Sequence, residues 1–261
     1  MMKYSLSLRE KRKIKMFFHE KTYDIDELVK HNMHIHTTFS GCAKPEMTVQ
    51  NIIRTAEEAG LTMIALTDHD NPEKINELAK NRKIILDELG ETDVKVLVGG
   101  ELSCTGIGKF LNDEDHDRQM DYKLYTMNHF HVSFWDQPED KTPRGYAVQM
   151  LKMAESVIKM READCFAHPF MPGYIKTIPD RDDVTKAYTD NELGDIMEKA
   201  TKKEIAWELN TSAVMRYPEF YHRYFQIGKE VGAVFNVGTD AHLLCNVNSK
   251  QFAEKLKEIL L

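Results

Sequence analysis

Two histidines separated by a single residue, His34 and His36, end a short β-like run early in the chain. Successive side chains of a strand point to opposite faces, so this spacing directs both imidazoles the same way. Neutral imidazole is a common metal ligand, and two converging rings make half of a metal site. A His-x-His pattern also occurs by chance in many chains, so its interpretation depends on the other β-like runs.

Other β-like runs also end in side chains that could bind a metal ion. They are Asp68, His69 and Asp70 after the second run, Glu101 after the third, His129 and His131 after the fourth, His168 after the fifth, and Asp240 and His242 after the seventh. The C-terminal ends of parallel strands share one face of a β/α barrel, where active sites are built. Imidazole and carboxylate ligands suit zinc, iron or manganese, and their number exceeds the four of a closed structural zinc site. The pattern therefore predicts more than one metal ion.

Hydrophobic periodicity indicates the elements that would position these residues, because short β-like runs alternate with longer helical stretches. The runs are 31–36, 62–67, 94–101, 122–131, 165–168, 205–210 and 233–239, and the helices are 49–60, 73–89, 143–161, a helix ending near 203, 219–231 and 249–261. Segment 112–121 is read as a loop, and segment 169–190 as a long excursion of the kind that often forms a functional lid. The alternation predicts an α/β fold with a parallel sheet, and seven units favour a closed or nearly closed barrel over an open doubly wound sheet.

The chain of 261 residues, with 42% hydrophobic and 30% charged residues, has the composition of a folded globular protein. We expect one barrel domain over 31–261, preceded by a helical extension over 1–30 that carries a basic amphipathic helix. No apolar run approaches the ~18 residues of a membrane span, and the first twenty residues lack the apolar core of a signal peptide.

Charge and cysteine usage restrict the partners and the compartment. The net charge of −7 argues against binding a long nucleic acid, which relies on clustered Lys and Arg. The four cysteines are widely spaced and form no CxxC pair, which favours free thiols in a reducing compartment. We therefore expect a cytoplasmic protein that acts on a small molecule without a membrane partner, and its oligomeric state stays open.

In combination, these motifs resemble the polymerase and histidinol phosphatase (PHP) family of metal-dependent phosphoesterases. The motifs are His34-x-His36, Thr67-Asp68-His69-Asp70, Gly100-Glu101, His168-Pro169 and Gly238-Thr239-Asp240-Ala241-His242. The resemblance extends from His31 to His242. It implies a distorted seven-stranded β/α (TIM-like) barrel, a cluster of two or three divalent metal ions and the hydrolysis of phosphate esters.

The resemblance also implies a role for each ligand position. The first metal ion takes the ligands His34, His36, Glu101 and Asp240. The second ion shares Glu101 as a bridge and adds His131 and His168. The third lies beside His69 and His242. If the register of the fourth strand is off by two residues, His129 replaces His131.

The third position departs from the family pattern. Family members often have an acidic residue where this chain has Gly41, so occupancy of the third position stays open. The neighbouring Cys42 could supply a thiolate to a soft metal ion such as zinc, or it could be a free structural thiol.

Several polar residues are candidates for supporting roles. Asp68 and Asp70 are expected to orient imidazoles rather than to bind metal themselves. Lys44 and Arg216 could bind a substrate phosphate, or they could be ordinary solvated cations. Two residues at the end of the sixth run could also reach the pocket, namely Glu208 and Asn210.

Together these features predict metal-dependent hydrolysis of a small phosphate ester, such as a nucleotide, histidinol phosphate or a sugar phosphate. A water bridging two metal ions has its pKa lowered from ~15.7 toward ~7 and would attack phosphorus as hydroxide. Two alternatives remain, a metal-dependent amide or ester hydrolase on a similar barrel and a non-catalytic metal-binding regulatory domain. The nearly complete ligand set favours an enzyme.

Overall fold

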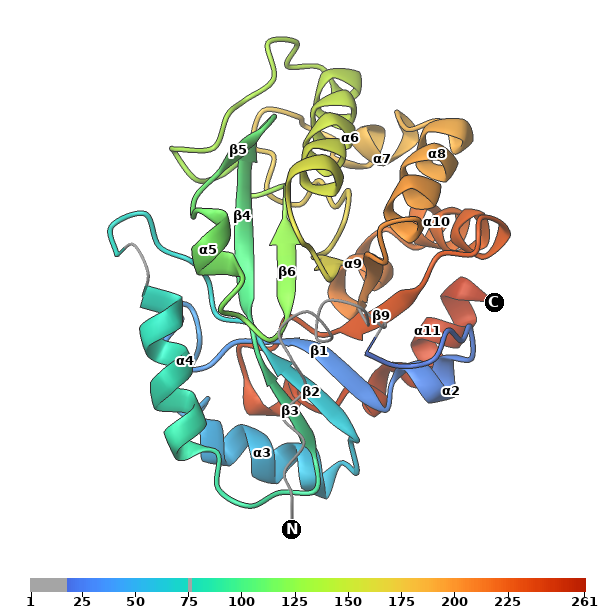
Figure 1. Ribbon diagram of the computed structural model, residues 1–261. Coiled ribbons are helices and arrows are strands. Elements are labelled where there is room, and N and C mark those ends of the chain that lie inside the picture. The colour runs from blue at the N-terminus through green and yellow to red at the C-terminus, as the bar shows by residue number, and fades with distance from the viewer. Residues whose placement is uncertain (1–17, 75–76) are drawn as a thin grey trace.

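The strands form two sheets that meet at the centre of the molecule in the computed structural model, which describes residues 18–74 and 77–261 (Figure 1). The smaller sheet is parallel and has the order β1 (His31–Ile35), β2 (Met63–Leu66), β3 (Lys95–Val98). The larger sheet has the order β5 (Lys109–Phe110), β4 (Gly100–Gly106), β6 (Lys123–Thr126), β7 (Cys165–Phe166), β8 (Ala206–Asn210), β9 (Phe235–Gly238). Within it only the pair β4–β5 is antiparallel. The predicted parallel α/β fold is therefore confirmed.

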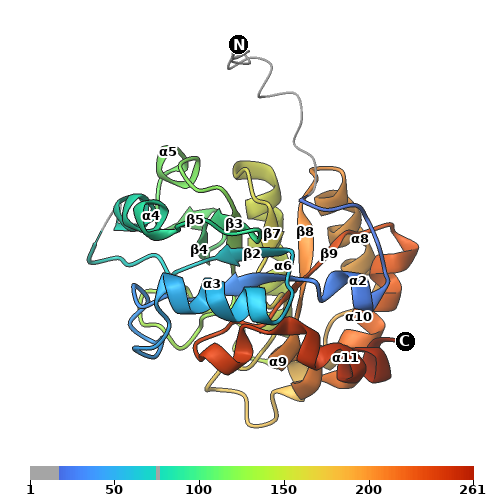
Figure 2. The ribbon, with the colours of Figure 1, turned by 90° about the horizontal axis from the view of Figure 1, so that it is seen from below.

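Helices surround these strands, as the view from below shows (Figure 2). The longer helices are α3 (Val49–Glu58), α4 (Glu77–Glu88), α6 (Pro143–Met160), α8 (Asp190–Thr201), α10 (Pro218–Glu230) and α11 (Ala253–Leu260). The shorter ones are α2 (Ile25–Leu28), α5 (Glu114–Asp117), α7 (Asp182–Lys186), α9 (Thr211–Arg216) and the 3-10 turns η1 (Leu244–Asn246) and η2 (Ser249–Phe252). Within the described ranges, none of these helices has the length and apolar character needed to cross a bilayer.

Local sequence explains where the main helices begin and which face they bury. The side chains of Thr48 and Thr142 accept hydrogen bonds from backbone N–H groups in the first turns of α3 and α6. In α6 the buried face includes Met150, Met153 and Val157, which recur at helical spacing. These side chains belong to the largest hydrophobic cluster of the core, between the helices and the six-stranded sheet.

Two isolated backbone bridges join the edges of the two sheets. Ile35 pairs with Ala241, just beyond β9, and His69, just beyond β2, pairs with Glu101 in β4. Ala241 accepts a hydrogen bond from His36 N at 3.0 Å and donates one to His34 O at 3.2 Å. The bridges therefore bring together the chain segments that carry the predicted ligands.

The predicted strand 94–101 is divided between the two sheets. Gly99 N donates to Leu66 O at 2.8 Å, whereas Gly100 N donates to Tyr122 O at 3.1 Å, so the chain changes its strand partner here. A Cβ atom on Gly99 would lie 2.1 Å from Tyr122 O, so a side chain does not fit at this crossing. The result is a three-stranded and a six-stranded sheet, and a closed seven-stranded barrel is not shown.

Other predicted boundaries also change. Segment 112–121 was expected to be a loop, but it contains α5, because the Asp113 side chain caps that helix by accepting from His116 N. The helix α9 was not predicted, and it begins because Asn210 caps it by accepting from Ala213 N at 3.1 Å. The basic helix predicted for the N-terminal extension falls largely on residues 1–17, outside the described residues. The described part of that extension contains α2, which packs against α11 and β9.

Candidate metal centre

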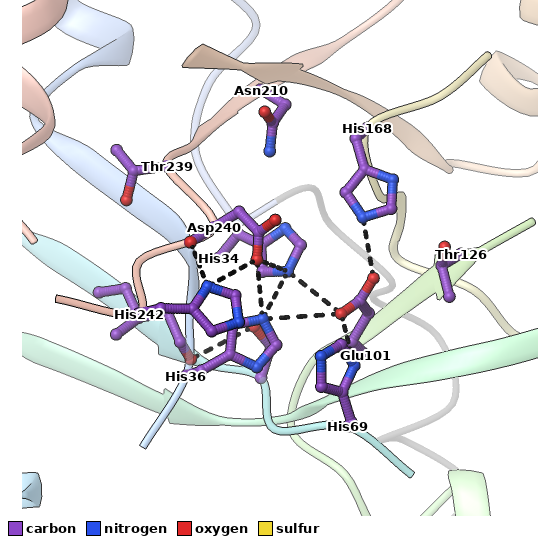
Figure 3. Close-up of polar contacts among 12 residues, drawn as sticks. His34, His36, His69, Glu101, Thr126, His168, Asn210, Thr239, Asp240 and His242 are labelled. Atoms are coloured by element: carbon purple, nitrogen blue, oxygen red, sulfur yellow. Dashed lines mark hydrogen bonds and ion pairs between the residues drawn. The ribbon is translucent and has the colours of Figure 1, made fainter. Parts of the chain in front are cut away.

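A first cluster of potential ligands lies at the ends of β1 and β9 and in β4 (Figure 3). His36 Nε2 lies 2.9 Å from Asp240 Oδ1, and His34 Nε2 lies 3.4 Å from the same oxygen. Glu101 Oε2 closes the group at 3.5 Å from His34 Nε2 and 3.6 Å from His36 Nε2. The two Nε2 atoms are only 3.2 Å apart. Two imidazoles and two carboxylates directed at one point are the ligand set of a divalent cation.

The second oxygen of the Glu101 carboxylate faces a different set of imidazoles. Glu101 Oε1 lies 3.0 Å from His168 Nε2 and 3.5 Å from His129 Nε2. His69 Nδ1 approaches the other oxygen, Oε2, at 2.9 Å. One ligand atom from each of His69, Glu101 and His129 lies within 4.8 Å of the others. A carboxylate whose two oxygens face two ligand sets is placed to bridge two cations.

The surroundings of Glu101 test whether these residues fit a metal ion. The side chain is fully buried, and Oε2 lacks a hydrogen-bond partner although three imidazole nitrogens lie within 3.6 Å of it. Buried carboxylate oxygens normally accept hydrogen bonds, but here the His34 and His36 contacts are long, at 3.5 and 3.6 Å, and the His69 contact at 2.9 Å lacks the angle of a hydrogen bond. A cation between the rings and the carboxylate satisfies all these atoms, and the residues therefore fit a metal ion.

A third cluster lies nearer to solvent and contains the thiol of Cys42. Cys42 Sγ lies 3.0 Å from His242 Nε2, and ligand atoms of His36 and His69 complete a group within 4.8 Å. Partial desolvation of the Cys42 thiol raises its pKa, but hydrogen bonding to His242 and His69 outweighs that effect and lowers the pKa to about 6. The structure thus brings Cys42 together with the two histidines that the resemblance places at the third ion.

The electrostatics of the first two clusters favour positive charge close to their carboxylates. Burial raises the pKa of Glu101, but the imidazoles of His69, His129 and His34 outweigh it and hold this pKa well below its usual range. Burial acts against protonation of His34, yet Glu208, Asp240 and Glu101 raise the pKa of this imidazole well above its usual value. Burial lowers the pKa of His129 to about 3. These directions favour an ionised Glu101 with positive charge close to it, and a cation bound among these side chains would supply that charge.

Glu208, in the middle of β8, connects the first two clusters. Its Oε1 accepts from His34 Nδ1 at 2.9 Å, and its Oε2 accepts from the backbone N–H of His168. Gly238 makes room for it, because a Cβ there would lie 1.8 Å from Glu208 Oε1 and 2.7 Å from His34 Cβ. Glu208 therefore fixes the imidazole of His34 so that Nε2 faces the cluster. Asn210, the other candidate from this strand, caps α9 instead.

The two carboxylates that flank His69 have different roles. Asp68 accepts from Thr37 N at 2.7 Å and from Ser40 Oγ at 2.6 Å, and Ser40 Oγ lies 3.1 Å from His36 Nδ1. Asp68 therefore acts on an imidazole through Ser40. Asp70 instead accepts from Ser103 N at 2.9 Å and Ser103 Oγ at 2.6 Å. Burial outweighs these hydrogen bonds and raises the pKa of Asp70 to about 6.

The backbone is unusual at one residue of each of the first two clusters. His168 and Asp240 have positive φ values of 27° and 51°, in a region that L-residues other than glycine seldom adopt. Asn128 holds the turn after His168 by donating to His168 O at 3.0 Å and Met171 O at 2.9 Å. Backbone held in such conformations is concentrated at functional sites.

The two histidines of the fourth predicted strand lie at different places relative to the clusters. His129, rather than His131, lies beside Glu101. The reason is that β6 ends at Thr126 and the chain then turns, with Phe130 N donating to Asn128 O at 2.8 Å. His131 lies further out, with its ring centroid 4.7 Å from that of Tyr174. Among the described residues, His131 is absent from the three potential ligand groups.

A cavity of about 460 Å³ opens over the clusters. Its walls include Cys42, His69, Asp70, His129, His131, Asp240 and His242 from the site, together with Phe134, Trp135 and Tyr174. Sequence reasoning did not identify these three aromatic residues, since no motif marks them. Trp135 Nε1 is buried without a hydrogen-bond partner. The cavity can therefore accept a ligand with a flat or apolar part beside the clusters.

The two candidate phosphate-binding cations, Lys44 and Arg216, do not line this cavity. The Lys44 side chain is exposed, and its backbone N–H donates to His242 O at 3.0 Å. Arg216 ends α9 and lines a separate hollow with Arg181, with its guanidinium 5.9 Å from the Tyr217 ring centroid. The unpredicted helix α9 carries Arg216 away from the clusters.

Comparisons with known proteins agree with this architecture. The family model for the PHP domain matches residues 32–212. An uncharacterized protein from Methanocaldococcus jannaschii is 32% identical over 97 residues, which are 33% of this chain and 53% of that protein, so the match spans about half of the relative's length. In fold, the chain is similar to histidinol phosphate phosphatase from Lactococcus lactis subsp. lactis, crystallised with zinc, L-histidinol and phosphate. That likeness has a TM-score of 0.55 and 17% identity, and covers 86% of this chain and 92% of the other.

Proposed function

The chain belongs to the PHP family, and from this premise we propose that it hydrolyses a small phosphate ester with the help of two or three divalent metal ions of the zinc, manganese or iron type. The observation that carries the proposal is Glu101, whose two oxygens face separate sets of imidazoles. Such a carboxylate supports two adjacent cations, which is the arrangement that many phosphoester hydrolases use. The structural neighbour, a phosphatase crystallised with zinc and phosphate, supports the same reaction.

The first two clusters have proposed roles in this centre. The first would hold one ion with His34, His36, Glu101 and Asp240. The second would hold another ion with Glu101, His129 and His168. The bridge between Ile35 and Ala241 and the bridge between His69 and Glu101 support a finer interpretation of the fold, in which the two sheets form one distorted seven-stranded barrel.

Bound cations would supply Lewis-acid activation of water and would neutralise the charge that develops on the phosphoryl oxygens. The protein's own residues hold that centre in place. Glu208 fixes the ring of His34 from behind, and Asp68 fixes His36 through Ser40. Rings held in this way need no reorganisation when the substrate arrives, which is the basis of electrostatic preorganisation.

The walls of the cavity favour a small phosphomonoester. No Lys or Arg of the described chain lines the cavity, so the phosphate charge has to be met by the metal centre. Phe134, Trp135 and Tyr174 leave a largely apolar wall for the leaving group. A volume of about 460 Å³ suits a nucleotide, histidinol phosphate or a sugar phosphate rather than a polymer.

A phosphate-release screen tests the proposal. The full chain is treated with a chelator, reloaded with zinc, manganese or iron, and assayed with p-nitrophenyl phosphate, nucleotides and other small phosphomonoesters. We expect release of phosphate only with added metal, and loss of release in His34→Ala and Asp240→Ala. His222→Ala is the control, because His222 is an exposed histidine on α10.

Two outcomes contradict the proposal. Turnover of amide or carboxylic ester substrates without phosphate release would make the chain a hydrolase of another class. Tight metal binding with no turnover of any substrate would make it a non-catalytic metal-binding domain.

A further inference from the structure

We propose that Cys42 is a metal ligand, and that the cluster of Cys42, His69 and His242 selects a thiophilic divalent ion, zinc above all, over magnesium or manganese. The role of this site in catalysis rests on the proposed phosphoesterase function, but metal binding by the site can be measured without any turnover. It concerns the outermost cluster, which we call the thiol cluster.

The geometry of the thiol cluster is that of a ligand set. Cys42 Sγ and His242 Nε2 are 3.0 Å apart, and ligand atoms of His36 and His69 lie within 4.8 Å of them. The rings of His36 and His242 are stacked, with centroids 4.3 Å apart. Donor atoms of Cys42, His69 and His242, residues far apart in the sequence, thus meet at one place beside the ring of His36, and a single hydrogen bond from the thiol does not explain that convergence.

His242 is held in the orientation that a ligand needs. Its Nδ1 lies 2.7 Å from the backbone carbonyl oxygen of Asp240 and donates to it. That hydrogen bond places the ring proton on Nδ1 and leaves the lone pair of Nε2 facing Cys42. Neutral imidazole and thiolate are both good ligands for zinc, whereas magnesium and manganese prefer oxygen.

The thiol cluster differs from the first cluster in exposure and in ligand type. His34 and His36 are fully buried, whereas His69 and His242 are about a third exposed, at 34% and 29% of the side chain, and Cys42 is exposed. Asp240 and Glu101 provide oxygen ligands to the first cluster, but the thiol cluster has none of its own. Cys42, His69 and His242 also line the cavity, so an ion held there has coordination positions open to a substrate oxygen.

The binding step is balanced without any other reactant. The S–H bond of Cys42 breaks, its proton passes to water, and a bond forms between the sulfur and the cation. No oxidant or reductant takes part, because thiolate ligation leaves the oxidation states of sulfur and zinc unchanged.

Cobalt provides a probe that does not depend on activity. The chelator-treated full chain, in a Cys245→Ser background that removes the other exposed thiol, is titrated with Co²⁺ and then with Zn²⁺. We expect a sulfur-to-cobalt charge-transfer band that zinc abolishes, and protection of Cys42 from iodoacetamide by zinc. Cys42→Ser should lose the band and one equivalent of bound zinc per chain.

A second variant separates ligation from a general effect on folding. Cys42→Asp replaces sulfur by oxygen at the same position, so we expect it to keep the third equivalent of metal, lose the band and bind manganese more tightly relative to zinc. The inference is overturned if the parent chain shows no charge-transfer band, or if Cys42→Ser retains every equivalent of zinc. Failure of the proposed function looks different, because a chain with the band but without phosphate release keeps the thiol cluster and loses only the phosphoesterase.

Discussion

Glu208 should control metal affinity although it belongs to none of the potential ligand groups. Glu208→Gln keeps the size of the side chain and removes its charge. The carboxylate accepts from two donors, His34 Nδ1 at 2.9 Å and the backbone N–H of His168. A carboxamide has one accepting oxygen, so one of these donors must face an NH₂ group.

The expected loss follows from the hydrogen bonds. A buried hydrogen bond to a charged group contributes about 1.5–3 kcal/mol, and each 1.4 kcal/mol is a factor of ten in an equilibrium constant. We therefore expect Glu208→Gln to weaken metal binding about 10- to 100-fold, which agrees with the ~10- to 100-fold typical of residues that orient metal ligands. Turnover at limiting metal should fall by a similar factor and recover in part when metal is in excess.

Competition with a chromophoric chelator measures this affinity directly. Glu204→Gln is the matched control, because it makes the same chemical change at an exposed position four residues earlier. The reasoning is refuted if Glu208→Gln binds zinc as tightly as the parent chain, or if Glu204→Gln weakens binding equally.

Three further predictions test particular features of the structure. His129→Ala should reduce kcat by more than the ~10- to 100-fold typical of orienting residues, whereas His131→Ala should mainly raise KM. Steady-state kinetics in which His131→Ala has the larger loss of kcat would contradict the position of His129 beside Glu101. Gly238→Ala should weaken metal binding without changing any charge, because the added Cβ would lie 1.8 Å from the carboxylate that orients the first cluster, and unchanged affinity in a chelator competition would show that this close packing is unimportant. Arg144 holds the pKa of Glu192 at about 2, so the pair stabilises the fold above pH ~4.5 and loses that contribution as the pH falls toward 2. Arg144→Gln should therefore lower the free energy of unfolding by roughly 1 kcal/mol at pH 7, after allowance for solvent screening, and the difference from the parent in urea denaturation should shrink toward pH 3 rather than stay constant.

Local sequence patterns predict much of the architecture. The alternation of β-like runs and helical stretches predicts the parallel α/β fold. The helices predicted to begin at 49 and 143 do begin there, after the capping side chains of Thr48 and Thr142. The i, i+2 spacing of His34 and His36 predicts that both rings converge, and their Nε2 atoms are 3.2 Å apart. These features are predictable because strand alternation and helix capping depend only on near neighbours in the chain.

Where the chain leaves a strand was decided only by tertiary structure. The switch of strand partner at Gly99 depends on the position of Tyr122 O, which no local pattern reveals. The same holds for the position of His129, rather than His131, beside Glu101, because β6 ends at Thr126 and the period of two no longer applies beyond it.

The sequence by itself therefore determined which residue types could bind metal ions and that strand ends would present them. The tertiary structure decided which of them meet and which oxygen of Glu101 faces which ring. It also placed Glu208 against His34 and placed Arg216 in a separate hollow. The physical reason is that ligand chemistry belongs to single residues, whereas their convergence depends on long-range strand register and on the sites where neighbouring side chains leave room. Cys42 shows both sides of this division, since its thiol was visible in the sequence but its contact with His242 Nε2 at 3.0 Å exists only in the folded chain.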